Sequence, residues 1–379
     1  MDIPVNIPNI SEDDISSLLQ TVRGGWVSST GPAVQEFEDR WAAKCGRKYG
    51  IAVANGTAAL ELSIRALELG PGDEVIIPDF TIISCANAVT LVGAIPIFVD
   101  SGFNSYCPDL DAIERAITNR TKAIMLVHIY GHSPDVEGIL KLAQKHGLKV
   151  IEDAAEMHGG EIEFSTGDWK KAGSFGNCST FSFFVNKLIT TGEGGMVLTD
   201  DLAIAEELRL LRNLYFRVPR YIHEKVGFNY RITSMQAALG IPQIERLDKI
   251  LIRKAEIHGR YCEALKEAFE YCEIFPISAN IKSSFWVVPV IFKSARLKAG
   301  IQSYLADKGI ETRDFFYPMH LQPNLQKFAD HQKSKFERST ELYSRGIYLP
   351  SGIGTTNKQI DKVAAEIIYA IKHKPEEKA

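Results

Sequence analysis

Lys187 stands where covalent chemistry is most easily performed in this sequence. It follows the aromatic run Ser179 to Phe184 and precedes a glycine-rich turn, Thr190 to Gly195. A lysine at the end of an apolar strand is partly desolvated, and desolvation favours the neutral amine. A neutral amine can condense with an aldehyde, so Lys187 could form a Schiff base. The alternative is a lysine that extends its charged end into water, which is the commoner role at a strand end.

Asp153 is a second candidate because it ends an apolar run, Val150 to Asp153. In a doubly wound sheet the carboxyl ends of the strands border the binding crevice. An aspartate there can pair with a protonated pyridine nitrogen, as in enzymes that use pyridoxal phosphate (PLP), and so keep the ring electron-withdrawing. A helix N-cap or a metal-binding aspartate explains the motif equally well.

A third candidate is the turn Asn55 to Ala58, which joins the apolar run Tyr49 to Ala54 to an amphipathic segment. Gly56 and Thr57 would stand at the start of a helix, where free backbone N–H groups and the positive end of the helix dipole attract an anion. The turn therefore suits a phosphate group. Thr57 as a simple N-cap is an equal alternative.

The elements that must position these residues alternate between short apolar runs and helical patterns. Ala58 to Leu69 and Pro134 to His146 each carry one apolar stripe, which is typical of helices that cover a sheet. The alternation predicts an α/β fold with a mostly parallel sheet. Only a glycine-rich turn joins the last two runs, so one pair should be antiparallel and the sheet mixed. The predicted strands are Tyr49 to Ala54, Glu74 to Pro78, Ile95 to Asp100, Ala123 to Ile129, Lys149 to Asp153, Ser179 to Phe184 and Gly195 to Thr199.

A second domain is predicted after a long helix from Ser234 to about Tyr271, with a bend at Pro242. We place the boundary near residue 248, which gives a large domain (1–248) that contains the three candidates and a small C-terminal domain (249–379). The terminal residues KPEEKA should fray. The elements predicted in the second domain are a strand at Ser284 to Phe292, a helix at Ala295 to Lys308, a strand at Glu311 to Phe316 and a helix at Asn357 to Lys372.

Composition excludes several classes of function. The net charge of −4 and a pI near 6.2 provide no overall positive field for nucleic acid or an anionic membrane surface. The first residues lack the pattern of a secretory signal, so a cytoplasmic protein is expected. Six scattered cysteines and nine histidines form neither a CxxC pair nor a metal-ligand spacing. We therefore predict reduced, mostly buried thiols, no metal site, no nucleic-acid partner and no membrane partner.

The three candidates occur in the order phosphate turn, aspartate, lysine, and the surrounding motifs make the resemblance specific. The chain resembles the DegT/DnrJ/EryC1/StrS family of sugar aminotransferases, within the aspartate-aminotransferase superfamily, from Trp26 to about Pro350. The resemblance implies a PLP-dependent transferase fold of type I, with a mixed, mostly parallel seven-stranded sheet and a smaller C-terminal α+β domain. The motifs that carry it are NGTAAL, GPGDEVIIPDFT, ITNRTKAIMLVHIYGH, IEDAAEMHGG, TFSFFVNKLITTGEGG, VGFNYRITSMQAALG and FYPMH.

Carried over to this sequence, the resemblance assigns two catalytic roles. Lys187 is the lysine that binds PLP as a Schiff base, and Asp153 is the partner of the pyridine nitrogen. Glu156 matches the position that approaches the ring hydroxyl. Asn229 matches an asparagine that reaches the phosphate in the neighbouring subunit, which implies a homodimer with shared active sites. The remaining positions that the resemblance places at the cofactor are Gly56, Thr57, Ala58, Ile82 and Ser182.

Two positions depart from the family pattern. Ile82 stands where the family usually has an aromatic ring that stacks on the cofactor, which puts stacking in question and leaves aliphatic packing on the ring face as the alternative. The segment Glu161 to Lys171 is longer than the usual loop between the aspartate and the lysine strand, and we expect it to shape a different substrate pocket. His158 and His320 are left out of the catalytic set, because a lone histidine near a site is more often structural.

The resemblance implies transfer of an amino group from L-glutamate to a keto sugar, nucleotide-linked and of the GDP-4-keto-6-deoxymannose type. The alternatives are a free oxidised ulosonic acid as acceptor and a non-catalytic PLP-binding regulator. A sugar dehydratase is disfavoured, because the dehydratases of this family have histidine in place of Lys187. The candidate cations for an anionic substrate are Arg217, Arg220, Lys225 and Arg313.

Overall fold

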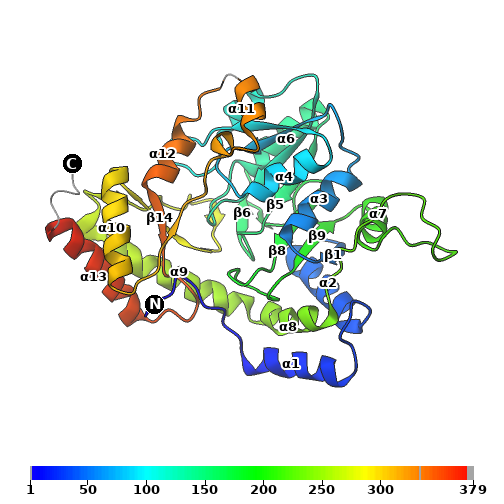
Figure 1. The fold of residues 1–379 in the computed structure, drawn as a ribbon, viewed down its shortest axis with the longest axis horizontal. Helices are drawn as coiled ribbons and strands as arrows, with labels where there is room; N and C mark the ends of the chain where they lie inside the picture. The colour runs from blue at the N-terminus through cyan, green and yellow to red at the C-terminus, as the bar shows by residue number, and fades with distance from the viewer. Residues whose placement is uncertain (1, 333, 374–379) are drawn as a thin grey trace.

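A computed structural model describes residues 2–332 and 334–373 of the 379 and contains a seven-stranded sheet at its centre (Figure 1). The strand order is β1-β9-β8-β5-β4-β2-β3, and helices cover the sheet on both faces. The predicted β2, β5 and β9 have the predicted bounds, and the other four differ at their ends by one or two residues. The strands are β1 (Tyr49–Val53), β2 (Glu74–Pro78), β3 (Ile95–Val99), β4 (Thr121–Val127), β5 (Lys149–Asp153), β8 (Cys178–Ser182) and β9 (Gly195–Thr199).

The strands β8, β5, β4, β2 and β3 run parallel, whereas β9 is antiparallel to both β8 and β1. The predicted mixed, mostly parallel sheet is therefore confirmed. The strand β8 ends at Ser182 and not at Phe184, because the chain turns sharply there: the Lys187 N–H donates to the Phe184 carbonyl at 2.9 Å. Lys187 consequently lies in the turn just beyond its strand.

The helices on the two faces of the sheet bury two separate apolar clusters. The face that α3 covers contains Leu62 and Ile64, and the opposite face contains Phe37 and Trp41 from α2; all four side chains are fully buried. Both α2 and α6 end at a glycine in the left-handed conformation, which only glycine adopts without strain. The covering helices are α2 (Pro32–Cys45), α3 (Gly56–Ala66), α4 (Ile83–Leu91), α5 (Leu110–Arg115), α6 (Val136–His146) and α7 (Leu202–Arg212).

The predicted long helix is wrong in two respects: it is two helices, α8 (Ser234–Glu245) and α9 (Leu247–Ala264), and it ends at Ala264 and not near Tyr271. Pro242 lies inside α8, where it leaves the Ala238 carbonyl without its helical donor, and the break falls one turn later, at Arg246. The Arg246 guanidinium bridges to the buried carboxylate of Asp14 in α1 (Glu12–Arg23). That ion pair fixes α1 alongside α8, where Figure 1 shows the two helices side by side.

The C-terminal part contains a four-stranded sheet of order β10-β12-β14-β13, covered by helices around a third apolar cluster. The predicted strand Glu311 to Phe316 is only two residues long, because Phe315 and Phe316 leave the sheet to pack on Phe80 and Tyr130. The division of the chain near residue 248 stays a proposal. The elements are β10 (Cys272–Glu273), β12 (Val288–Phe292), β13 (Arg313–Asp314), β14 (Gly346–Leu349), α10 (Ala295–Asp307), α11 (Gln326–Gln332), α12 (Glu337–Arg345) and α13 (Asn357–His373), with 3₁₀ turns at Lys266–Ala268 and Met319–Leu321.

The long segment from Glu161 to Lys171 forms the hairpin of β6 (Glu161–Glu163) and β7 (Trp169–Lys171). The hairpin pairs with β11 (Ile281–Lys282), and Glu161 forms ion pairs with Lys171 and Lys282. None of its residues lines the cavity of about 650 Å³ that contains Lys187. Contrary to the expectation from its length, the segment does not shape the cavity of its own chain but forms a small sheet that joins the two halves of the chain.

Other expectations concern the thiols and the termini. All six cysteines are free, and five are buried. Among the described residues, no helix is long and apolar enough to cross a membrane. The C-terminal KPEEKA lies outside the described residues.

Lys254 in α9 yields a prediction about pH and stability. Its ammonium is buried and donates to the carbonyls of Trp286 (2.9 Å) and Ser351 (2.5 Å), and burial lowers its pKa to about 7. At pH values between about 7 and the ordinary pKa of lysine, the unfolded chain binds one more proton than the folded chain. The free energy of unfolding therefore rises with pH over this range. Relative to Lys254→Met, the wild-type free energy of unfolding should rise by about 1.4 kcal/mol per unit between about pH 8 and pH 10.

The measurement is denaturant unfolding of both proteins at several pH values. All other titrating groups are common to the two proteins and cancel in the difference. A difference that stays constant over this range would show that Lys254 keeps an ordinary pKa.

Candidate active site

A cavity of about 650 Å³ opens at the carboxyl ends of the central parallel strands. Its wall combines the turn after β1, the ends of β5 and β8, the turn that contains Lys187, and residues from the C-terminal part. The cavity brings together eight of the nine residues predicted at the cofactor: Gly56, Thr57, Ala58, Ile82, Asp153, Glu156, Ser182 and Lys187. The ninth, Asn229, does not line it.

The Lys187 amine lies against a carboxylate on one side and an aromatic ring on the other. Its Nζ is 3.8 Å from Glu156 Oε1 and 3.7 Å from the centroid of the Trp286 ring, and the side chain is 10% exposed. Burial lowers the pKa of this amine, while the carboxylates of Glu156 and Asp153 oppose the shift. The amine is therefore shielded from bulk water, as a nucleophilic lysine requires.

The Asp153 carboxylate is buried and has only weak or neutral partners. Its Oδ1 accepts the Ala155 N–H at 3.0 Å, and the Cys85 thiol donates to Oδ2 at 3.4 Å. No ion pair to it is present among the described residues, and burial raises its pKa. A buried carboxylate without a cation is costly. A protonated pyridine nitrogen would supply the missing positive charge, so this side of the cavity fits PLP.

Glu156 connects the lysine to the backbone after β4. Its Oε2 accepts the Tyr130 N–H at 2.8 Å, while Oε1 faces Lys187. Burial raises the pKa of Glu156 to about 7, and the nearby Lys187 opposes that shift. A carboxyl group with this pKa changes protonation near neutral pH and can exchange protons with its neighbours.

The amino end of α3 forms the opposite side of the cavity. Asn55, and not Thr57, is the N-cap: its side chain accepts the Ala58 N–H at 2.9 Å. The first two N–H groups of a helix have no acceptor within it, which leaves those of Gly56 and Thr57 to face a phosphate. A Cβ at Gly56 would lie 2.9 Å from Ser182 Cβ, so only glycine allows this close approach.

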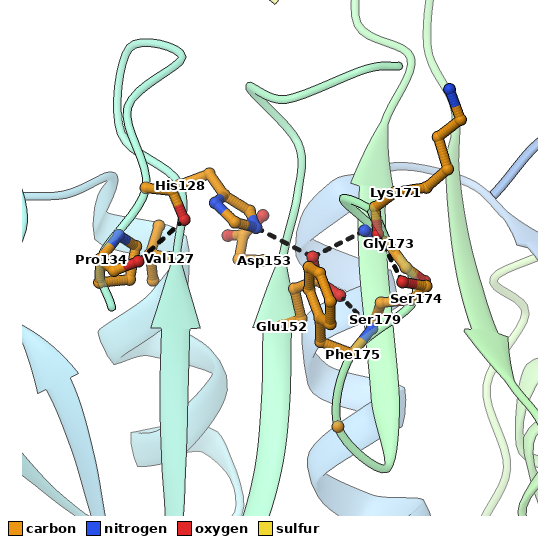
Figure 2. A network of polar contacts seen from close by, with 12 residues as sticks. Val127, His128, Pro134, Glu152, Asp153, Lys171, Gly173, Ser174, Phe175 and Ser179 are labelled. Atoms are coloured by element: carbon orange, nitrogen blue, oxygen red, sulfur yellow. Dashed lines mark hydrogen bonds and ion pairs between the residues drawn. The ribbon is translucent and has the colours of Figure 1, made fainter. Parts of the chain in front are cut away.

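A buried network behind the cavity fixes the end of β5 (Figure 2). Glu152 points away from Asp153, as successive strand residues do. Its carboxylate accepts the N–H groups of Gly173 (2.6 Å) and Phe175 (2.8 Å) and contacts His128 Nε2 at 2.9 Å. Because all these groups are fully or nearly buried, β5 has little freedom, and Asp153 is held in place at its end.

Four residues named in the sequence analysis need individual comment. Ile82 is the residue before α4 and lines the cavity, where an aliphatic side chain replaces the usual ring. Asn229 is exposed, and its Oδ1 accepts from Arg231 Nε at 2.9 Å. His158 and His320 contact other parts of the core: His158 packs on Trp41, and His320 Nδ1 is 2.7 Å from Asp79 Oδ2.

Sequence reasoning missed Trp286 and Cys85. Trp286 covers Lys187 and donates its Nε1–H to the Asn186 carbonyl at 2.8 Å. Cys85 donates to Asp153 from the first turn of α4. Neither residue stands in a motif with the group it contacts, and the only local signal was an aromatic residue ahead of the apolar run of β12.

Comparison with known proteins agrees with this geometry. The profile of the DegT/DnrJ/EryC1/StrS aminotransferase family matches residues 8–368. GDP-perosamine synthases from Escherichia coli O157:H7 and Caulobacter vibrioides are 38% and 39% identical to the chain over 96% of its length and 97% of theirs. The structure of DesV from S. venezuelae matches with a TM-score of 0.87 and 30% identity, over 94% of each chain.

The matches extend over both parts of the chain and include the cavity. The sequence motifs also resemble those of GDP-perosamine synthases. Lys187, Asp153 and the turn at Gly56 line one cavity, and the buried Asp153 carboxylate in it fits a protonated pyridine ring. The chain belongs to the DegT/DnrJ/EryC1/StrS aminotransferase family and is a PLP-dependent aminotransferase with the type I fold.

Proposed function

We propose that this enzyme transfers an amino group from L-glutamate to a nucleotide-linked keto sugar. The observation that carries the proposal is the position of the Lys187 amine. It is nearly buried, and it shares one cavity with the buried Asp153 carboxylate and the open amino end of α3. Lys187 and Asp153 are the proposed catalytic residues, and Gly56, Thr57, Ala58 and Ser182 would hold the cofactor phosphate. A cytoplasmic location also stays a prediction.

The chemistry that PLP supplies when bound is an electron sink for the pair released at the substrate carbon. The negative charge of Asp153 would keep the ring nitrogen protonated. Lys187 acts as general base and acid: it removes the proton from the donor α-carbon in the first half-reaction. In the second it delivers a proton to the sugar carbon that receives the amino group.

Two neighbours support Lys187 in this role. Glu156, whose pKa of about 7 lies near neutrality, can hold a proton beside the amine. The Trp286 ring covers the amine and excludes water from one side. Together they shield the amine from bulk water and place a second titrating group beside it.

The proposed acceptor is a GDP-4-keto-6-deoxymannose type of sugar. The relatives named GDP-perosamine synthase support it, because they match the chain from end to end with 37% to 39% identity. A relative at 36% identity, from Aneurinibacillus thermoaerophilus, is named for a dTDP-linked amino sugar, which also supports a nucleotide-linked substrate.

The test follows the two half-reactions separately. Glutamate added to the PLP-loaded enzyme should remove the visible absorbance of the cofactor and release 2-oxoglutarate in equal amount. GDP-4-keto-6-deoxymannose should then restore the absorbance and yield an amino sugar. If glutamate leaves the spectrum unchanged while another amino acid alters it, the donor is wrong; if none does, the protein is not an aminotransferase.

We also propose that the enzyme is a homodimer in which Asn229 of one chain donates to the cofactor phosphate of the other. Two observations support this. Asn229 is exposed and does not line the cavity of its own chain. The segment between α7 and α8, which contains it, projects from the body (Figure 1) and exposes Val218 (98%), Tyr221 (73%) and Val226 (80%). Apolar side chains this exposed favour an interface.

A mixing experiment tests the shared site. Under conditions of subunit exchange, Lys187→Ala and Asn229→Ala chains should form heterodimers in which one site contains both changes and the other contains neither. Activity should then exceed that of either parent, by up to a quarter of the wild-type value at equal mixing if exchange is random. The matched control mixes Lys187→Ala with Asp153→Asn, which belong to the same site and should restore nothing.

The result that contradicts the proposal is equally specific. If exchange is verified, Asn229→Ala alone is impaired, and mixing still restores no activity, then Asn229 acts within its own chain.

A further inference from the structure

The substrate of the proposed function is anionic, and the structure separates the four cations that could bind it. Arg217, Arg220 and Lys225 lie in the projecting segment between α7 and α8. Arg217 pairs with Glu224 at 3.3 Å, Lys225 pairs with Glu207 at 2.9 Å, and Arg220 lies over aromatic rings of the same segment. None of the three lines the cavity of the described chain. Arg313 does.

The described wall of the cavity is otherwise acidic. Four carboxylate side chains line it, and Lys187 is the one lysine and Arg313 the one arginine among the described lining residues. Lys187 is committed to the cofactor in the proposed function. Among the described residues of the same chain, Arg313 is therefore the one permanent cation that a substrate oxyanion meets in this cavity, whereas the segment of Arg217, Arg220 and Lys225 would reach the partner chain in the proposed homodimer. The four carboxylates are those of Glu61, Asp153, Glu156 and Glu193.

The Arg313 guanidinium has N–H groups that are available to a substrate. It extends from β13, directly opposite Tyr348 of β14 in the sheet register. Its one ion pair, to Glu311 Oε1, is long at 3.4 Å, and Glu311 also accepts the Val5 N–H at 2.9 Å. The Arg313 side chain is half exposed. A guanidinium has five N–H donors in a planar fork that matches carboxylate and phosphate oxygens.

Arg313 also stands at a junction between two cavities. A second cavity of about 150 Å³, bordered by the N-terminal segment, shares with the first cavity the side chains of Arg313, Tyr348, Trp286, Phe184 and Asn186. The Asn186 Oδ1 atom on this shared wall is buried and has no hydrogen-bond partner among the described residues. A buried acceptor without a partner is unusual in a folded protein and indicates a ligand that donates to it.

We propose that Arg313 binds an oxyanion of the substrate, with Asn186 Oδ1 accepting a hydroxyl or N–H of the same molecule. The inference rests on the proposed function, and it makes Arg313 the residue through which this chain selects anionic substrates. The oxyanion is a carboxylate of the amino donor or a phosphate of the nucleotide-linked acceptor. Both offer the same chemistry to a guanidinium.

The test replaces Arg313 with Met, which keeps much of the length and loses the charge, and with Lys, which keeps the charge and loses the fork. For Arg313→Met we expect the substrate concentration at half-maximal rate to rise about 10- to 100-fold in at least one half-reaction. The maximal rate should change by less than about threefold, because the oxyanion is remote from the bond that reacts. Arg313→Lys should fall between Met and wild type.

The two half-reactions identify the oxyanion. A loss confined to the glutamate half-reaction assigns Arg313 to a carboxylate, and a loss confined to the keto-sugar half-reaction assigns it to a phosphate. Calorimetry should agree with this assignment. Arg313→Met should weaken the binding of glutarate to the PLP-loaded enzyme if Arg313 binds the carboxylate, and the binding of GDP if it binds the phosphate. The control is Arg338→Met, which removes a 46% exposed guanidinium outside both of these cavities and should change nothing.

If both half-reactions and both binding constants are unchanged in Arg313→Met, the inference is overturned. Failure of the proposed function looks different, because wild-type enzyme would then show neither half-reaction.

Discussion

Lys187→Ala should lower the multiple-turnover rate by at least about 1,000-fold while the protein folds normally. The change removes both a nucleophile and a general acid–base, whose positioned proton transfers alone contribute about 100- to 10,000-fold. It should not disturb the core, because the side chain lies at the edge of a cavity, against Glu156 and the Trp286 ring. The measurement is steady-state amino transfer, with circular dichroism to establish folding.

Lys187→Arg is the matched variant. It keeps a positive charge between Glu156 and Trp286, but an arginine side chain stays protonated and cannot act as a base at neutral pH. Both variants should therefore be inactive. If Lys187→Arg were active, the charge and not the amine would be the requirement, and the proposed mechanism would be wrong.

Asp153→Asn should lower the rate about 100- to 1,000-fold and leave part of the PLP binding intact. The amide has the shape of the carboxylate but no negative charge, so it cannot hold the ring nitrogen protonated. Removing one partner of a buried, charged hydrogen bond costs several kcal/mol, which corresponds to a rate change of this size. The measurement is the rate of each half-reaction at saturating substrate.

Cys85 provides a control that separates charge from orientation. Cys85→Ala removes the thiol that donates to Asp153 Oδ2 but leaves the carboxylate charged. We expect a loss of only a few-fold, because one weak donor is lost and the Ala155 N–H remains. Cys85→Ser should restore the donor and the rate. If Asp153→Asn were as mild as Cys85→Ala, Asp153 would be a structural residue.

The sheet was largely predictable because its signals are local. Strands β2, β5 and β9 are short apolar runs bounded by charged or turn residues, and their bounds agree with the sequence pattern. The break between α8 and α9 was not predictable, because it depends on more than Pro242. The Arg246 side chain at that break is held by Asp14, far away in the sequence, and no local pattern encodes such a contact.

The cavity residues also divide into those with local signals in the sequence and those whose contacts join distant segments. Lys187, Asp153 and the turn at Gly56 could be predicted because each ends a recognisable strand, and a parallel sheet brings such ends together. Trp286 and Cys85 escaped because their contacts join distant segments. The segment Glu161 to Lys171 was misjudged because its length was visible in the sequence and its pairing with β11 was not.

Trp286 has a consequence for anyone who builds chimaeric enzymes from this family. The Trp286 ring covers Lys187, and its indole N–H donates to the Asn186 carbonyl. The backbone carbonyl of Trp286 accepts a hydrogen bond from Lys254. A chimaera that takes its C-terminal half from another enzyme, in order to change the sugar preference, would therefore also replace the residue that covers the Lys187 amine. Such a graft retains a shielded amine only if it brings an aromatic residue at this position, so the junction of a successful chimaera belongs after Trp286.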